Sequence, residues 1–171
     1  VARPVALSVH VDAEARALPT RDTVMWGGRV RLTAHRRSLH ADLDLGASYA
    51  STRGELGEVL LRSASVGLGA GPRFATETLI ADLGLRAELG WAWVRGEPAF
   101  ADVRTGTGSS PLVSAGLRLS LQAPAQARIR PSLTLEGGGV IRGVRAEVSG
   151  QPVAGMTGYY LLAALGLGAS L

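Results

Sequence analysis

The sequence predicts an all-β chain, an eight-stranded antiparallel up-and-down transmembrane β-barrel formed by a single domain of residues 1–171. Three observations predict it: a two-residue alternation of apolar side chains that recurs eight times, connections that alternate between long and short, and aromatic residues at one end of the expected strands. The alternation is clearest in residues 79–94, LIADLGLRAELGWAWV. Because successive side chains of a strand point to opposite faces, this stretch has one apolar and one charged face.

The eight expected strands are, in chain order, residues 5–12, 24–34, 39–49, 59–71, 79–94, 113–122, 129–141 and 159–171. Pro4 precedes the first strand, which is an acceptable place for a proline. Each of the others sets a Leu, Val, Ala or aromatic residue at every second position against Gly, Ser, Thr or charged residues. The seventh is the least regular, because Pro131 and Gly137 to Gly139 interrupt it.

The connections between these strands differ in length in a regular way. Residues 13–22, 52–58, 95–110 and 143–155 are expected as long loops, and residues 35–38, 72–78 and 124–128 as short turns. Long loops on one side and short turns on the other, joining an even number of strands, are typical of outer-membrane barrels. This layout predicts that the first strand begins and the last strand ends on the short-turn side.

The face opposite the apolar one carries charges of both signs. Its expected members are Arg29, Arg31, Asp42, Asp44, Asp82, Arg86, Glu88, Arg118, Arg130 and Glu136. The basic and acidic groups balance, which suits a mutually neutralising interior better than a solubilising surface. An eight-stranded barrel has just enough interior to be filled by side chains. We therefore expect a plugged, polar interior and an outer wall that meets lipid.

Aromatic residues on the apolar face give an independent indication. An interfacial girdle is expected at the strand ends next to the long loops, made of Trp26, Tyr49, Trp91, Trp93 and Tyr159. Arg62 is the one charged residue on the apolar face of its strand. An arginine costs about 2–4 kcal/mol at the bilayer midplane and about 0–1 kcal/mol near the interface. Its position just after residues 52–58 predicts contact with lipid headgroups.

Composition excludes several classes of protein. The chain has no Cys, which excludes a disulfide scaffold, a thiolate metal site and a Cys nucleophile. The net charge is +4, but the arginines are scattered singly except for Arg36 and Arg37, so no nucleic-acid binding is expected. No apolar run approaches the roughly 20 residues of a spanning helix. The first residues lack the pattern of a signal peptide, which predicts either a cytosolic chain or a mature form from which the signal has been removed.

Two other folds remain open at this stage. Leu, Ala, Arg and Glu are good helix formers, so residues 79–94 are also compatible with a helix, although Gly84 and Gly90 and the absence of a 3.6-residue period disfavour it. A soluble β-barrel or sandwich would turn the apolar face inward and the charged face to water.

In strand number, loop alternation, girdle and charged interior, the chain resembles the eight-stranded outer-membrane barrels of Gram-negative bacteria, such as the OmpA transmembrane domain, OmpX and OmpW. The resemblance covers the whole length and includes no residue-level motif. Members commonly end in an aromatic residue, whereas this chain ends in Leu171. The resemblance implies a location in the bacterial outer membrane, with outer-membrane lipid and lipopolysaccharide as partners.

Catalysis is not expected, and neither is a cofactor or a metal. Some eight-stranded barrels deacylate lipid A, but no outward-facing His with a neighbouring Ser is found among His10, His35 and His40. His40 and Asp42 are expected on the inner face as part of a hydrogen-bond network, with a metal or proton relay as the alternative. Inward glycines at positions 67–71, 166 and 168 suggest a small vestibule at the short-turn end.

The sequence predicts a structural or interaction protein. Its barrel would display the loops 13–22, 95–110 and 143–155 or would support a protein partner within the membrane. The alternative is a narrow channel or transporter for small or hydrophobic solutes. The two differ in whether the interior is blocked.

Overall fold

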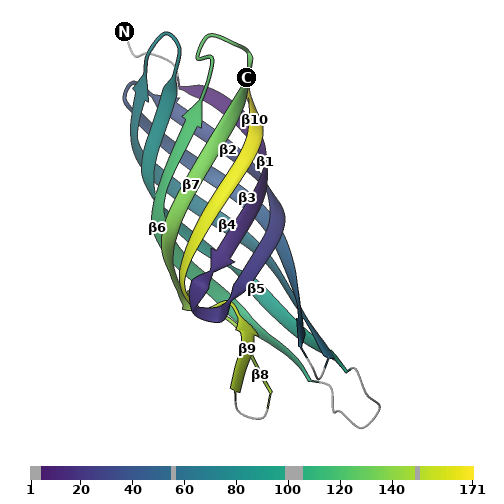
Figure 1. Ribbon diagram of the computed structural model, residues 1–171. Coiled ribbons are helices and arrows are strands. Elements are labelled where there is room, and N and C mark those ends of the chain that lie inside the picture. Colours follow the sequence, from purple (N-terminus) through teal and green to yellow (C-terminus); the bar gives the residue numbers. More distant parts are fainter. Residues whose placement is uncertain (1–4, 55–56, 99–105, 149–150) are drawn as a thin grey trace.

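In the computed structural model, eight long strands close into an antiparallel barrel in the order β1-β10-β7-β6-β5-β4-β3-β2 (Figure 1). The structure describes residues 5–54, 57–98, 106–148 and 151–171. The barrel strands are β1 (Ala6–Leu18), β2 (Thr23–Arg36), β3 (Leu39–Gly54), β4 (Gly57–Ala75), β5 (Ile80–Pro98), β6 (Thr107–Gln122), β7 (Ile129–Arg142) and β10 (Gly158–Ser170). The predicted eight-stranded up-and-down barrel is therefore confirmed.

The remaining elements are small. A hairpin of β8 (Arg145–Val148) and β9 (Gln151–Gly155) stands apart from the barrel wall between β7 and β10 (Figure 1). A 3-10 turn, η1 (Pro19–Arg21), joins β1 to β2. Within the described part of the chain, no helix has the length and apolar character needed to cross a membrane.

The prediction of a loop at residues 13–22 is wrong, because β1 continues to Leu18 and pairs with β2 as far as Leu18 opposite Thr23. The charged residues of this stretch suggested a loop, but they lie on the inner face and alternate with small outward alanines. The turn begins only at Pro19, whose ring has no N–H to donate to a strand ladder.

The other expected long loops are also partly strand. β3 and β4 stay paired up to Gly54 opposite Gly57, and β5 pairs with β6 up to Arg95 opposite Thr107. The four strands β3 to β6 therefore project beyond the barrel as a sheet (Figure 1). The opposite end carries the tight turns, including the two residues between β2 and β3, where Arg37 has a φ of 56°.

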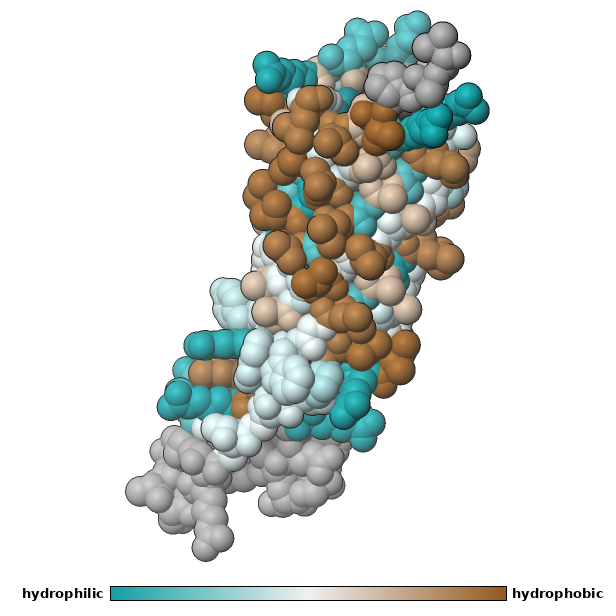
Figure 2. Space-filling model, turned by 180° about the vertical axis from the view of Figure 1, so that it is seen from behind, coloured by the Kyte–Doolittle hydropathy of each residue, from teal (hydrophilic) through white to brown (hydrophobic). Residues whose placement is uncertain are grey.

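The outer wall is apolar along most of its length. Leu68, Leu85 and Leu165 are 63%, 70% and 67% exposed, whereas Asp44 of the inner face is 0% exposed. Figure 2 shows the apolar side chains as a continuous zone between two hydrophilic ends. Most of the large apolar side chains of the barrel strands therefore face outward and most of their ionised groups inward, which is the reverse of a soluble sheet protein.

The interior also contains an apolar layer, whereas the sequence predicts a polar interior throughout. It lies at the end where the sheet projects, and every barrel strand contributes to it. Its strand members are Leu18, Met25, Ala50, Leu61, Ala92, Leu112, Val140, Tyr160, Leu162 and Ala164. Val144, Ala154 and Met156 from the β8–β9 segment pack against them. The interior is thus charged in its middle and apolar toward this end.

Candidate functional site

The barrel interior brings together all ten of the charged residues singled out from the sequence. Each is at most 6% exposed, and they come from β2, β3, β5, β6 and β7. They are Arg29, Arg31, Asp42, Asp44, Asp82, Arg86, Glu88, Arg118, Arg130 and Glu136. A charge buried in this way is tolerated only when it is paired and hydrogen-bonded.

Arg86 is the centre of this network. Its guanidinium contacts Asp44 at 2.6 Å, Glu136 at 3.0 Å and Glu88 at 3.2 Å. Glu88 lies on the same strand as Arg86, β5, whereas Asp44 and Glu136 come from β3 and β7. Each of these two strands is separated from β5 by one strand, so the Arg86 side chain joins strands that are not neighbours in the sheet. Arg118 of β6 binds Asp42 and lies 3.3 Å from Asp44.

Several interior groups lie within residues 13–18, where the sequence predicts a loop and the structure has a strand. Arg16 of β1 binds Glu88 of β5 at 2.9 Å across the full width of the barrel, and its guanidinium lies 5.1 Å from the centre of the Tyr160 ring. Glu14 binds Arg29 at 2.8 Å. The signal was present in the sequence, since Asp12, Glu14 and Arg16 continue the two-residue alternation of the first strand.

The short-turn end of the interior holds His40 and two arginines. His40 lies 3.6 Å from Asp42 and 3.9 Å from Asp82, and Arg73 binds Asp82 at 3.1 Å. Arg130 donates to the Ala125 carbonyl at 3.0 Å and to the Ser170 hydroxyl. Among the described residues, no group of three or more His, Asp or Glu side chains is arranged to hold a metal ion.

The space beside the inward glycines, where a vestibule is expected, is instead occupied by neighbouring side chains. A Cβ at Gly67 would stand 2.5 Å from the Arg86 guanidinium, one at Gly69 would stand 2.6 Å from that of Arg118, and one at Gly168 would stand 2.4 Å from the His10 ring. The prediction of a vestibule is therefore wrong at these positions. The glycines give the long charged side chains the room they occupy.

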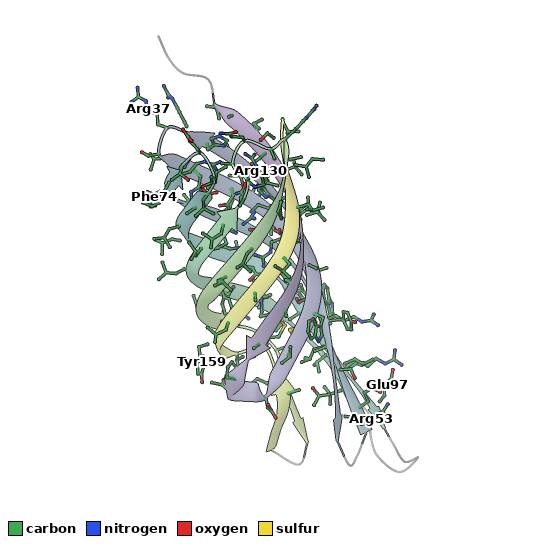
Figure 3. All side chains as sticks on the ribbon, turned by 45° about the horizontal axis from the view of Figure 1, so that its top comes forward. Arg37, Arg53, Phe74, Glu97, Arg130 and Tyr159 are labelled. Carbon is green, nitrogen blue, oxygen red and sulfur yellow. The ribbon has the colours of Figure 1, made fainter. Side chains whose placement is uncertain are left out.

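The aromatic residues lie on the outer wall near the projecting sheet. They are between 43% and 61% exposed: Trp26, Tyr49, Trp91, Trp93 and Tyr159. The strand register puts Trp26 opposite Tyr49, Tyr49 opposite Arg62, and Arg62 opposite Trp93. Arg62 therefore lies within the aromatic row. Figure 3 shows Tyr159 pointing away from the wall, while Arg37 and Phe74 mark the opposite end.

The projecting sheet carries exposed ion pairs. Arg53 lies 3.5 Å from Glu58, and Arg95 lies 3.7 Å from Glu97. The Ser51 hydroxyl donates a hydrogen bond to Glu58, and this bond lowers the pKa of that carboxyl. Arg53 and Glu97 both lie on this projection, beyond the barrel wall (Figure 3).

Solved structures with the same architecture cover nearly the whole chain. Neisserial surface protein A superposes with a TM-score of 0.61 at 9% identity, covering 98% of this chain and 97% of that protein. The fold is that of the eight-stranded outer-membrane barrels. The barrel is also similar to the attachment invasion locus protein Ail of Yersinia pestis, with a TM-score of 0.58 at 12% identity over 98% of this chain and 97% of Ail.

A third similar structure is a major outer membrane protein of Thermus thermophilus, with a TM-score of 0.64 at 12% identity over 99% of this barrel and 100% of that chain. No protein-family model matches the barrel, and no curated protein matches it. At these identities the likeness concerns the fold alone.

Proposed function

We propose that this chain is a bacterial outer-membrane protein whose closed, non-conducting barrel acts as a scaffold for interaction at its projecting end. The apolar outer wall supports the membrane placement, because exposed leucines of this extent have no favourable contact in water. The aromatic row supports it too, since such rows lie at membrane–water interfaces. The similar solved structures are outer-membrane proteins.

The observation that carries the closed barrel is the reach of the interior ion pairs. Arg16 joins β1 to β5, and Arg86 joins β5 to both β3 and β7. On this proposal, side chains that meet across the lumen block a continuous path for water or ions along it. The apolar layer around Leu61 and Leu112 adds a second barrier in series, because water is poorly accommodated between apolar side chains.

The scaffold would serve partners at its projecting end. The sheet of β3 to β6 presents the charged side chains of Arg53, Arg95 and Glu97 there, and the outer wall would meet outer-membrane lipid and lipopolysaccharide. Ail has been crystallised with the heparin analogue sucrose octasulfate, which supports a sulfated glycan as one partner to test against the exposed Arg53 and Arg95. Protein partners within the membrane belong to the same proposal, and no enzymatic role does.

Conductance tests the proposal directly. The refolded barrel is inserted into planar bilayers, and we expect no steady conductance. The matched positive control is Arg86→Ala with Leu61→Ala, which removes one group from each barrier and should conduct if it folds. Steady conductance from the unaltered barrel would overturn the closed scaffold and favour the narrow channel or transporter.

A further inference from the structure

The outer wall carries a groove of about 940 Å³ beside the aromatic row. It spans β3 to β6 where these strands leave the closed barrel and continue as the projecting sheet. Its larger walls are Tyr49, Leu60, Arg62, Trp93, Arg95 and Glu97. Small residues, among them Ala47, Gly108 and Ser109, line the space between them. The groove is therefore partly aromatic and apolar, and its charged part has two arginines against one glutamate.

The two arginines of the groove lie close together on the same face. Arg62 is opposite Trp93, and Arg95 is two residues beyond Trp93 on the same strand, opposite Leu60. Diagonal neighbours of this kind in an antiparallel pair are about 7–8 Å apart. Guanidinium groups at this spacing can converge on one phosphate, to which each presents two parallel N–H donors.

Among the described residues, one carboxylate, that of Glu97, forms an ion pair with either arginine of the groove. Arg62 is exposed and makes no ion pair with any residue that the structure describes. Arg95, with a side chain 69% exposed, has one contact, with Glu97 at 3.7 Å. An unpaired cation beside tryptophan, at the level where a barrel leaves the membrane, favours an anionic group of the surrounding lipid.

We infer that this groove is a binding site for one phosphate-bearing lipid of the leaflet next to the projecting sheet. Arg62 and Arg95 bind the phosphate. Tyr49, Leu60 and Trp93 contact the glycerol or sugar and the first part of an acyl chain. The inference rests on the proposed membrane placement, and it extends the expected headgroup contact of Arg62 to a two-arginine site with an apolar wall.

Native mass spectrometry of the folded barrel in non-ionic detergent tests this inference, with dioleoyl phosphatidate as the probe. We expect one saturable phosphatidate, at least tenfold weaker binding by dioleoyl phosphatidylcholine, and at least a tenfold loss in the variant Arg62→Gln with Arg95→Gln. The variant Arg36→Gln with Arg37→Gln removes the same charge at the opposite end and should bind as the original does. Heat-dependent mobility on SDS gels verifies that each variant is folded.

A matched pair of tryptophan variants tests the apolar wall of the groove. Trp93→Ala should weaken phosphatidate binding at least threefold, whereas Trp91→Ala, on the same face but outside the groove lining, should leave it unchanged. Equal binding by the two double-arginine variants, or equal binding of phosphatidylcholine, would overturn the inference. So would competition by inorganic phosphate at the concentration at which phosphatidate binds, because the site would then recognise an anion and not a lipid. These outcomes are independent of conductance, so failure here is distinguishable from failure of the closed barrel.

Discussion

Arg86 and Asp44 form a bidentate pair in the centre of the barrel, with Nε donating to Oδ2 at 3.0 Å and Nη2 donating to Oδ1 at 2.6 Å. The side chains are 1% and 0% exposed. Parallel charge-assisted bonds of this type are among the strongest in proteins, and they fix the orientation of both groups. Three interior carboxylates contact the same guanidinium, so its removal takes one cationic partner from each of them and leaves the buried network one positive charge short.

Replacing Arg86 by Met should therefore lower the free energy of unfolding by about 3–5 kcal/mol, the cost of breaking a buried pair from one side. Urea unfolding in lipid vesicles, followed by tryptophan fluorescence, measures it. Adding Arg118→Met should lower stability further, because Asp44 then keeps only the longer contact with Arg29, at 3.6 Å. The control is Arg53→Met, which removes an exposed pair with Glu58 and should change little. Equal effects of Arg86→Met and Arg53→Met would show that the interior is solvated.

Adjacent glycines of β7 should respond differently to a methyl group. A Cβ at Gly138 would stand 2.3 Å from the Ala115 carbonyl oxygen, whereas one at Gly139 would meet nothing within 4 Å. Gly138→Ala should therefore cost about 1–3 kcal/mol through overpacking against backbone. Gly139→Ala should be neutral or stabilising by a few tenths to about 1 kcal/mol. The same urea titration compares them, and a larger loss at Gly139 would contradict the assigned faces.

The two sides of β4 offer a similar comparison for leucine. Leu61 is 0% exposed in the apolar interior layer, and Leu68 is 63% exposed on the outer wall. Leu61→Ala should cost about 2–5 kcal/mol, because a cavity remains. Leu68→Ala should cost clearly less, since lipid can fill the vacated space. A reversed order of the two unfolding free energies would contradict the interior layer.

The tryptophans report the position of the interface. The chain contains three, Trp26, Trp91 and Trp93, and all three are exposed on the outer wall near the projecting sheet. Lipids brominated near the headgroup should therefore quench tryptophan fluorescence more strongly than lipids brominated near the chain ends. Stronger quenching by the deeper bromines would mean that the tryptophans lie near the bilayer midplane, and would contradict an interfacial position of the aromatic row.

The sequence predicted the barrel and its sidedness well, because both depend on the two-residue alternation of a strand. It failed at residues 13–18, where Glu14 and Arg16 were interpreted as loop residues although they occupy the interior. Charge on a strand is ambiguous until its partners across the lumen are known, and those partners, such as Glu88 of β5, lie far away in the chain. The occupation of glycine positions by arginine side chains depends equally on tertiary contacts.

The groove and the apolar interior layer were beyond prediction for the same reason. Arg62 was singled out from its strand, but Arg95 was assigned to a loop, and only the register between β4 and β5 places the two side by side. Leu18 and Met156 join one layer although the chain separates them by nearly its whole length. Alternation along a strand does not show which residues of different strands share a level of the barrel.

The most direct test of the account concerns the direction in which the leucines face. The chain has no cysteine, so a single nitroxide label can be placed through Leu85→Cys on the wall, with Arg53→Cys on the projecting sheet as the reference. In reconstituted bilayers the label at position 85 should be accessible to oxygen and protected from a water-soluble nickel chelate, with the reverse at position 53. Access of the nickel chelate to position 85 equal to that at position 53 would mean that the leucine wall faces water, and would contradict the account.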